Sequence, residues 1–375
     1  MGAERRGDLD GLRALATGAV FLFHCAKHFD QDGWHLSNRP TTLPFTAAVV
    51  GVSLWLMPLF FLLSGASTRL ALGARGIGRL LQDRVLRLLL PFAFGVLVIV
   101  PPQVWVERLG AGEFQGSFWA FYPRYFEGWY AFGGNFAWMG LHLWYLLLLF
   151  LLTLILAPLL SWLVRGGGQG LRERVEQGLA SPLGLLGPLA LTWAVEVAIA
   201  GTVHDFRGLG GWWPGQYLLY FLVGLLLASS AVRARLRSLA APALLLGTAA
   251  MLVYAGTRFL SEAEIAMVPR PLWRLIRALG SWGVLYGVLG LGDRWLGDRS
   301  WTARLNEASM PFYILHQTVI LLFAWALLPW ALAPALKYLC LVAIAFPTTA
   351  LLTWAVLRIW PLRPLFGLRL PRSGP

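Results

Sequence analysis

Long apolar stretches follow one another along almost the whole chain, separated by short basic or aromatic segments. A transmembrane helix needs about 20 mainly apolar residues, so the pattern predicts an all-α, polytopic transmembrane bundle of about ten spans. Residues 8–360 would form this domain, and residues 361–375 would form a cytoplasmic tail rich in Pro and Arg. The predicted spans are 12–29, 45–64, 86–106, 140–163, 182–202, 216–231, 240–257, 272–291, 308–328 and 336–359.

Two of these spans, 45–64 and 86–106, contain Pro or Gly and are expected to be kinked. In the first, Ser64 and Gly65 follow an aromatic and aliphatic run, which predicts a helix end where another backbone approaches closely. No Gly-x-Ser-x-Gly frame surrounds Ser64, so we do not expect this serine to be a nucleophile.

The composition supports a membrane protein. Of the 375 residues, 58% are hydrophobic and 13% are charged, whereas a soluble domain is about half apolar and about a quarter charged. A net charge of +13 can indicate nucleic-acid binding, but here the arginines lie between apolar spans. We therefore expect a multi-pass protein of the cytoplasmic (inner) membrane, in contact with the lipid bilayer and without a nucleic-acid partner.

The arginines also predict the orientation. Cytoplasmic loops carry an excess of Lys and Arg. Alternate loops of this chain are rich in Arg, at residues 69–87, 165–174, 233–237, 294–304 and 358–372. If these loops are cytoplasmic, an even number of spans places both termini in the cytoplasm, and His24 lies toward the outer half of the first span.

His24 follows Arg13 by eleven residues within the first apolar segment. Eleven residues make about three helical turns, so the two side chains share a face about 16 Å apart, and Asp10 falls near the same stripe. An ionisable side chain inside a membrane span is costly and by default indicates a functional site. Histidine can also exchange a proton near neutral pH. The first span therefore carries a candidate chemical site.

Arg84 and Arg87 form an Arg-Val-Leu-Arg sequence at the cytoplasmic mouth of the third predicted span. Residues three apart face the same way on an α-helix. Two guanidinium groups side by side suit a phosphate or pyrophosphate. Arginine pairs are also common anchors at the cytoplasmic ends of spans, so the spacing leaves both interpretations open.

Three more ionisable side chains lie in apolar segments. Glu196 is predicted to form an ion pair with Arg274 or Arg277, or else to act as a proton relay or to orient a histidine. His142 and His316 each fit either a hydrogen-bonded core histidine or a site residue. The partner that orients His24 also stays open at this point, with Glu196, Asp30 and Asp32 as the candidates.

A metal centre is not expected. His24 and His28 are four residues apart and could chelate a metal from one helix face, but the sequence offers no third ligand nearby. Cys25 and Cys340 form no Cys-x-x-Cys motif. We therefore expect no metal and no permanently bound cofactor.

The longest outer segment, residues 107–139, is rich in aromatic side chains interspersed with Glu and Arg. Such side chains can stack on sugar faces. They can equally form the aromatic belt that membrane proteins place at the lipid–water interface.

Four motifs together resemble the membrane-bound acyltransferase 3 family, and the similarity extends over residues 8 to about 320. Each corresponds to a family motif, and they occur in the family's order. They are Asp10-Gly-Leu-Arg13 with ten residues before His24, Phe61-Leu-Leu-Ser64-Gly65, Arg84-x-x-Arg87, and Tyr313-Ile-Leu-His316-Gln317.

The resemblance implies an enzyme that moves an acyl group from cytoplasmic acyl-CoA to a hydroxyl of a periplasmic or cell-surface glycan. His24 would be the general base, worth about 10²–10⁴-fold in rate, or would carry the acyl group transiently. Arg84 and Arg87 would hold the phosphates of CoA, and Arg13 would line the donor channel. The residues that would support the site or bind substrate are Asp10, Glu196, His142, His316, Tyr313 and Trp144.

Within the family, the chain resembles the members that succinylate periplasmic glucans. The similarity lies in Trp34-His35-Leu36, in the runs 101–108 and 121–126, and in His142-Leu-Trp-Tyr-Leu146. Many other members have a carboxylate after the Leu-Trp pair, whereas this chain continues with Tyr and Leu. Succinyl follows from this resemblance alone, and acetyl fits the chemistry equally well.

Two other classes of function stay open at this stage. A proton-coupled transporter or flippase of a sugar- or lipid-linked substrate could use Glu196 and the histidines as a proton path, although we find no paired broken helices of the kind such carriers use. A structural membrane protein could bury the same side chains as packing elements only.

Overall fold

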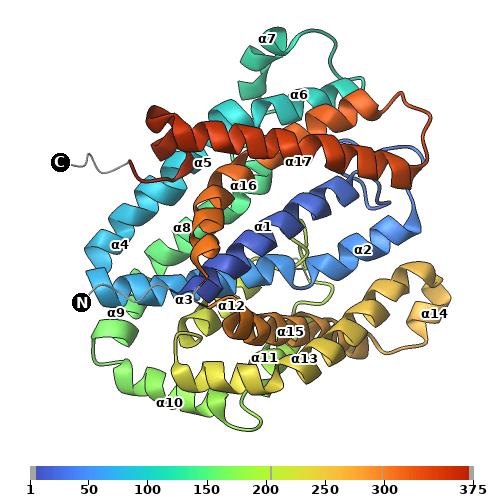
Figure 1. Ribbon diagram of the computed structural model, residues 1–375. Coiled ribbons are helices and arrows are strands. Elements are labelled where there is room, and N and C mark those ends of the chain that lie inside the picture. Colours follow the sequence, from blue (N-terminus) through green and yellow to red (C-terminus); the bar gives the residue numbers. More distant parts are fainter. Residues whose placement is uncertain (1–5, 203–204, 298, 371–375) are drawn as a thin grey trace. The chain divides into compact units, whose positions relative to one another are not determined.

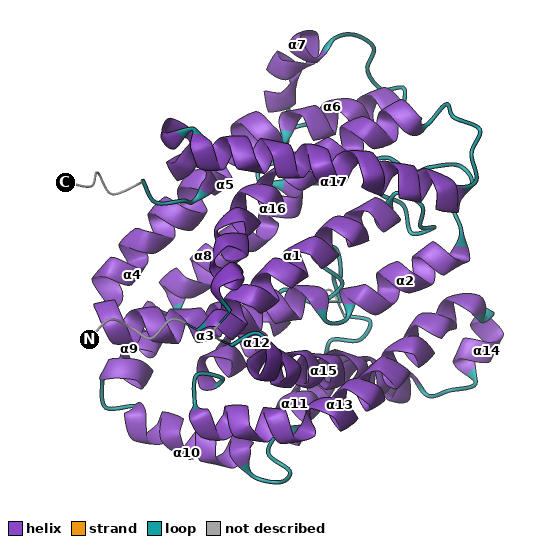
Figure 2. Cartoon of the chain, viewed as in Figure 1, coloured by secondary structure: helices purple, strands orange, loops and turns teal. Residues whose placement is uncertain are grey.

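The computed structural model describes residues 6–202, 205–297 and 299–370, which form helices joined by loops (Figure 1, Figure 2). Within these residues the only extended pairing is an isolated bridge between Trp129 and Phe136. The chain divides into two compact units, which we describe separately. Unit 1 comprises Met1–Ala16, Ala47–Leu81 and Leu152–Leu305, and unit 2 comprises Thr17–Thr46, Gln82–Leu151 and Asn306–Pro375.

Several helices continue from one unit into the other. These are α1 (Gly7–Lys27), α2 (Leu43–Ser53), α4 (Ile77–Arg84), α8 (Trp144–Ile155) and α16 (Ser300–Leu327).

The other elements belong to a single unit. Those of unit 1 are α3 (Leu56–Arg75), α9 (Ala157–Arg165), α10 (Gln169–Ala180), α11 (Leu186–Ala198), α12 (Gln216–Leu226), α13 (Ser230–Gly256), η6 (Thr257–Phe259), α14 (Glu262–Ala266) and α15 (Arg270–Trp295). Those of unit 2 are η1 (Val85–Leu89), α5 (Leu90–Phe94), η2 (Gly95–Ile99), α6 (Pro101–Gly110), α7 (Phe118–Phe121), η3 (Tyr122–Phe126), η4 (Tyr130–Phe132), η5 (Leu141–Leu143), α17 (Pro334–Arg358) and η7 (Trp360–Phe366).

The described residues contain seven helical segments that are long and apolar enough to cross a membrane, or eight if one bent pair counts as a span. The seven are Gly7–Lys27, Leu43–Arg75, Ile77–Gly110, Ser230–Phe259, Arg270–Trp295, Ser300–Leu327 and Pro334–Arg358. These segments agree with the predicted all-α membrane architecture.

The difference from the ten predicted spans lies in three segments in the middle of the chain. The predicted span 140–163 is bent by 62° where Leu141–Ile155 meets Ala157–Arg165. The predicted spans 182–202 and 216–231 form the shorter helices α11, of 13 residues, and α12, of 11 residues. At about 1.5 Å per residue, each is shorter than a hydrocarbon layer of about 30 Å.

Both segments that were predicted to be kinked depart locally from a regular α-helix. In Leu43–Arg75, the helix is interrupted at Leu54 and Trp55, between α2 and α3. In Ile77–Gly110, the chain widens into the π-helical turns η1 and η2, and Pro91 and Pro101 follow these turns. Proline lacks an N–H group and clashes with the preceding turn, which favours such local widening.

The prediction that a helix ends at Ser64 and Gly65 is wrong, because both lie inside α3. The predicted close backbone approach is present. A Cβ atom on Gly65 would lie 2.0 Å from the carbonyl oxygen of Phe221, and one on Gly224 would lie 2.2 Å from that of Leu62. Glycine thus allows the backbones of α3 and α12 to touch, which is a common way for helices to pack in membranes.

The same kind of packing joins α13 and α15, which lie side by side (Figure 1). Gly247 and Gly283 face each other so closely that a Cβ atom on either would lie within 2.6 Å of backbone atoms of the other helix. Unit 1 is therefore built partly on backbone contacts between small residues.

The core of unit 2 gathers apolar side chains from α1, α6, α16 and α17. Its fully buried members include Phe21, Cys25, Ile320 and Leu341. The segment after α17 also packs within this unit, since Phe366 is buried and the centroid of its ring lies 5.4 Å from that of Phe94. The described part of the predicted tail is therefore folded.

Candidate functional site

His24 and His316 form a hydrogen-bonded pair in unit 2. His24 lies in the last turn of α1 and His316 lies inside α16. The Nδ1 atom of His24 is 2.7 Å from the Nε2 atom of His316, and the two rings are stacked with their centroids 4.9 Å apart. The ring of Trp34 stacks with that of His24 at 5.6 Å. His316 is buried and His24 is half-buried.

The protonation of this pair follows from a carbonyl group that can only accept a hydrogen bond. The Nδ1 atom of His316 lies 2.6 Å from the carbonyl oxygen of Tyr313, so Nδ1 carries the proton and donates. In neutral His316, the Nε2 atom must then accept, and Nδ1 of His24 must donate to it. Neutral His24 is left with its lone pair on Nε2, which is the form that can take a proton from a hydroxyl.

His142 lies beside His316, with its ring edge-on at a centroid distance of 5.3 Å. Its Nε2 atom donates to the carbonyl oxygen of Ile314 at 3.1 Å, and its Nδ1 atom accepts from Gln103 at 3.4 Å. The hydroxyl of Tyr313 donates to the backbone carbonyl of His142. Both sequence-predicted residues, His142 and Tyr313, therefore hold the segment of α16 that carries His316.

The backbone just before His142 is in an unusual conformation. Gly140 has φ +79° and Leu141 has φ +47°, so two consecutive residues lie in the left-handed region. A leucine there costs about 1–3 kcal/mol, and such residues tend to cluster at functional sites. Trp144 follows at the start of α8 and is buried.

Two glutamines complete this polar layer. Gln317 belongs to the fourth family motif and Gln103 to the run 101–108, but the sequence assigned a role to neither. Gln317 donates from Nε2 to Oε1 of Gln103 at 3.0 Å, and Gln103 donates from Nε2 to the hydroxyl of Thr318 at 2.7 Å. Gln103 and Gln317 are buried. Polar groups inside a membrane must find hydrogen-bond partners. A glutamine within an apolar span therefore indicates a buried polar contact, and both glutamines could have been identified from the sequence on this ground.

Arg13 and Asp10 lie on α1 within unit 1. Arg13 donates from Nη2 to the hydroxyl of Ser67 at 2.8 Å, and its Nη1 atom lies 3.9 Å from Oδ1 of Asp10. Arg13 is thus paired with Asp10 on its own helix and also forms a hydrogen bond to α3 that the sequence did not reveal.

Arg84 ends α4, and Arg87 lies in the π-helical turn η1. Arg84 is half-buried and Arg87 is exposed. Arg87 donates from Nε to the carbonyl oxygen of Gly367 at 3.1 Å. The π-turn changes the angle between the two side chains from the α-helical spacing that the prediction assumed.

Glu196 is fully buried within an ion-pair cluster of unit 1. Its carboxylate lies 2.5 Å from Arg207, 3.7 Å from Arg274 and 3.6 Å from Arg277. Burial lowers the pKa of the Arg207 guanidinium, but hydrogen bonds and ion pairs with Glu196 and Asp205 outweigh it and hold that pKa above its usual range. The geometry corresponds to the ion-pair interpretation of Glu196.

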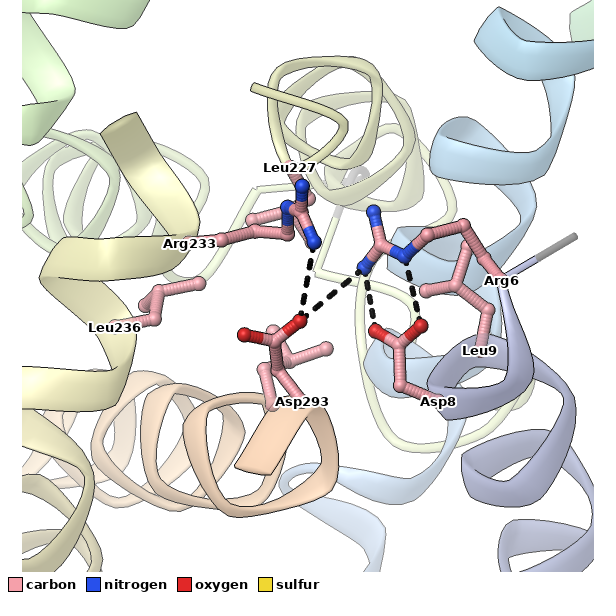
Figure 3. Close-up of a pocket in the computed structure, with 8 residues that line it drawn as sticks. Arg6, Asp8, Leu9, Leu227, Arg233, Leu236 and Asp293 are labelled. Carbon is pink, nitrogen blue, oxygen red and sulfur yellow. Dashed lines mark hydrogen bonds and ion pairs between the residues drawn. The ribbon is translucent and has the colours of Figure 1, made fainter. Parts of the chain in front are cut away.

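A second cluster of charges lines a small pocket of unit 1 (Figure 3). Arg6 donates to Asp8 at 2.7 Å, and Asp293 lies 3.3 Å from Arg233 and 3.8 Å from Arg6. Because the two carboxylates face the two guanidinium groups, this cluster links α1, α13 and α15 by ion pairs and offers no unshared base.

Within the described residues, no group of three or more His, Cys, Asp or Glu side chains has the geometry of a metal site. His28, the other histidine considered as a metal ligand, is buried, and its Nδ1 atom is engaged by a backbone carbonyl group. Its Nδ1 atom donates to the carbonyl oxygen of Leu36 at 2.5 Å. The polar layer around His24 is therefore built from hydrogen bonds between protein groups.

Comparison with known proteins identifies the class of enzyme. Residues 6–358 match the model of an acyltransferase domain, that of the acyltransferase 3 family. No curated protein and no solved structure matches the chain. The resemblance noted in the four sequence motifs is thus confirmed at the level of the family, over nearly the whole length. With its apolar helices, the chain belongs to the acyltransferase 3 family and is a multi-pass membrane acyltransferase.

Proposed function

We propose that this enzyme transfers an acyl group from cytoplasmic acyl-CoA to a hydroxyl of an extracytoplasmic glycan, with His24 as the general base. The observation that carries the proposal is the His24–His316 hydrogen bond of 2.7 Å, together with the carbonyl contact that fixes its direction. These two contacts leave the lone pair of His24 on Nε2, on a side chain that is half-buried.

The reaction can be written with this pair alone. The Nε2 atom of His24 takes the proton of the acceptor hydroxyl while the hydroxyl oxygen bonds to the carbonyl carbon of the thioester. The carbon–sulfur bond then breaks, and His24 returns the proton to the sulfur, which gives free CoA. His316 accepts the hydrogen bond of His24 throughout and stabilises the transient imidazolium. A positioned base of this kind contributes about 10²–10⁴-fold.

The donor half of the proposal rests on charge. CoA carries a pyrophosphate and a ribose phosphate, and paired guanidinium groups bind such anions well. Arg84 and Arg87 lie in a segment rich in Arg, which the distribution of charges assigns to the cytoplasmic side. Arg13 and Asp10, one above the other on α1, would line the path of the donor.

The remaining site residues have supporting roles in this proposal. His142 and Tyr313 hold the α16 segment around His316, and Trp144 is buried at the start of α8, two residues after His142. Glu196 would act by holding three arginines in unit 1. The resemblance to glucan biosynthesis protein C favours succinyl as the acyl group and a periplasmic glucan as the acceptor, in the bacterial inner membrane.

Donor binding and acyl transfer test the proposal separately. Acetyl-CoA and succinyl-CoA would be titrated against purified protein in a bilayer mimic, for the wild type, His24→Ala and the control His28→Asn, which replaces a histidine one turn away. We expect saturable binding in all three and a loss of transfer of about 100-fold or more in His24→Ala only. If the folded wild type binds neither thioester, acyl-CoA is not the donor. If His24→Ala keeps full transfer, His24 is not the base.

A further inference from the structure

The loop after α1 and the aromatic outer segment meet in a second polar cluster of unit 2. His35 lies 2.5 Å from the carboxylate of Glu107, measured from Nδ1 to Oε2. The hydroxyl of Tyr130 donates to both oxygens of the same carboxylate, at 2.9 Å and 2.8 Å. The sequence assigned no catalytic or binding role to His35 or Glu107.

The directions of these hydrogen bonds leave two acceptor atoms on half-buried side chains. A carboxylate only accepts, so Nδ1 of His35 is protonated and the lone pair of the neutral ring lies on Nε2. Burial and the neighbouring Glu107 raise the pKa of Tyr130, so its hydroxyl stays protonated. This hydroxyl donates its hydrogen bond to Glu107. The Nε2 atom of His35 and the oxygen of Tyr130 can therefore each accept a hydrogen bond from a hydroxyl group.

The cluster is held in place by Arg108. This side chain donates to Oδ1 of Asn135 at 2.9 Å, to the carbonyl oxygen of Gly134 at 2.9 Å and to Glu113 at 2.8 Å. Its guanidinium also lies 5.7 Å from the centre of the Tyr130 ring. These contacts of Arg108 join the outer segment around Tyr130 to α6.

One aromatic ring connects this cluster to His24. The ring of Trp34 stacks with that of His24 at 5.6 Å and lies 5.3 Å from that of His35. Trp34, His35 and Tyr130 are half-buried, while Trp129 and Phe132 on either side of Tyr130 are 56% and 86% exposed. Hydrogen-bond acceptors and open aromatic faces therefore occur together beside the proposed base.

This combination suits one class of ligand. A sugar presents hydroxyl groups at its edge and an apolar C–H face, which aromatic rings cover well. A lipid-facing aromatic belt has no need of a His–Glu pair held by a fixed arginine. In the outer segment, residues 107–139, three carboxylates outnumber two guanidinium groups, which disfavours a strongly anionic ligand.

We propose that Trp34, His35, Glu107 and Tyr130 form the subsite that binds the acceptor, and that the acceptor is a neutral saccharide. This inference rests on the proposed function, since it assigns the acceptor side of the same reaction. The His35 ring and the Tyr130 oxygen would accept hydrogen bonds from sugar hydroxyls. Trp34 would cover the apolar face of the sugar, so that a neighbouring hydroxyl reaches Nε2 of His24.

The first test is kinetic, with a neutral glucan oligosaccharide as the acceptor and the acyl-CoA that binds the wild type as the donor. His35→Phe and Trp34→Leu should raise the KM for the oligosaccharide about tenfold or more, while the Kd for the donor stays unchanged. Trp119→Leu is the matched control, because Trp119 lies in the same outer segment and is 78% exposed. It should leave both constants unchanged.

The second test does not depend on turnover. Diethyl pyrocarbonate modifies neutral imidazoles, and mass spectrometry would follow its reaction with His35 in the full-length wild type. The oligosaccharide should slow the modification of His35 by severalfold, and acyl-CoA should not. If the donor binds but the oligosaccharide neither protects His35 nor accepts the acyl group, the subsite proposal is overturned while the proposed donor stands. If the donor itself does not bind, the fault lies with the proposed function.

Discussion

The Nδ1 atom of His24 lies 2.7 Å from the Nε2 atom of His316, 292 residues further along the chain. The Nδ1 atom of His316 in turn donates to the carbonyl oxygen of Tyr313. A carbonyl cannot donate, so this last contact sets the direction of the whole chain of hydrogen bonds. In the proposed mechanism His316 would therefore be the positioning residue of His24, a role for which the sequence left Glu196, Asp30 and Asp32 as candidates.

Substitutions at His316 should separate its role as an acceptor from its role in packing. His316→Phe keeps a ring in the layer but removes the acceptor for Nδ1 of His24. We expect transfer to fall about 10–100-fold, less than for loss of the base itself, which is worth about 10²–10⁴-fold. His316→Gln, which offers an amide oxygen as acceptor, should restore part of this loss. The measurement is kcat across a range of pH.

The pH profile distinguishes positioning from simple destabilisation. If His316 supports the imidazolium of His24, the apparent pKa in the kcat profile should shift in His316→Phe and return toward the wild-type value in His316→Gln. Equal losses in both variants, with an unshifted profile, would assign His316 a packing role only.

The arginine pair makes a prediction about donor affinity. Arg84→Ala combined with Arg87→Ala should weaken acyl-CoA binding about tenfold or more, because each charge-assisted hydrogen bond to a phosphate contributes about 1.5–3 kcal/mol. Arg79→Ala, an exposed arginine on α4, is the control and should bind like the wild type. Dephospho-CoA thioesters compared with the intact donor would show which phosphate is held. Unchanged affinity in the double variant would restrict Arg84 and Arg87 to membrane anchoring.

Two glycines of one helix should respond to alanine in opposite directions. A Cβ atom on Gly65 would lie 2.0 Å from the carbonyl oxygen of Phe221, whereas one on Gly73 would meet no atom within 4 Å. Gly65→Ala forces α3 and α12 apart and should cost about 1–3 kcal/mol. Gly73→Ala should be neutral or stabilise by up to about 1 kcal/mol, because alanine is the better helix former. Melting temperatures in detergent would check this, and a normal value for Gly65→Ala would contradict the backbone contact.

The stability of unit 2 should depend on pH through His28. Burial lowers the pKa of His28 to about 4 in the folded protein, against an ordinary value of 6.5. The folded state then binds fewer protons than the unfolded state between these values, so stability rises with pH there. The contribution is fully present above pH 6.5 and is lost as the pH falls toward 4, by about 3 kcal/mol in all.

The variant His28→Asn isolates this contribution, because asparagine can still donate to the carbonyl oxygen of Leu36 but does not titrate. The melting temperature of the wild type should fall more steeply between pH 6.5 and 4 than that of the variant. Parallel curves for the two proteins would show that His28 is not buried as a neutral group.

Much of the architecture is determined locally and was therefore predictable. Hydropathy located the long apolar helices, since each must present about 20 apolar residues to the membrane whatever its neighbours are. Pro91 and Pro101 disturb their own helix, so an irregularity in that segment could be predicted, and π-helical turns precede both prolines. The short helices α11 and α12 were predicted as full spans because of their apolar composition. An apolar segment can be surrounded by lipid or by other protein segments, and composition does not distinguish the two.

The candidate site also has a part that could be predicted from the sequence and a part that depends on the tertiary structure. The sequence by itself determined that His24 is an ionisable group in a membrane helix, and that four motifs follow the order of the acyltransferase 3 family. Only the tertiary structure decided that His316 forms a hydrogen bond with His24, that Gln103 and Gln317 meet, and that His35 lies against Glu107. Each of these pairs joins segments far apart in the chain. The partner of a buried polar group is set by which helices pack together, and no local pattern of residues carries that information.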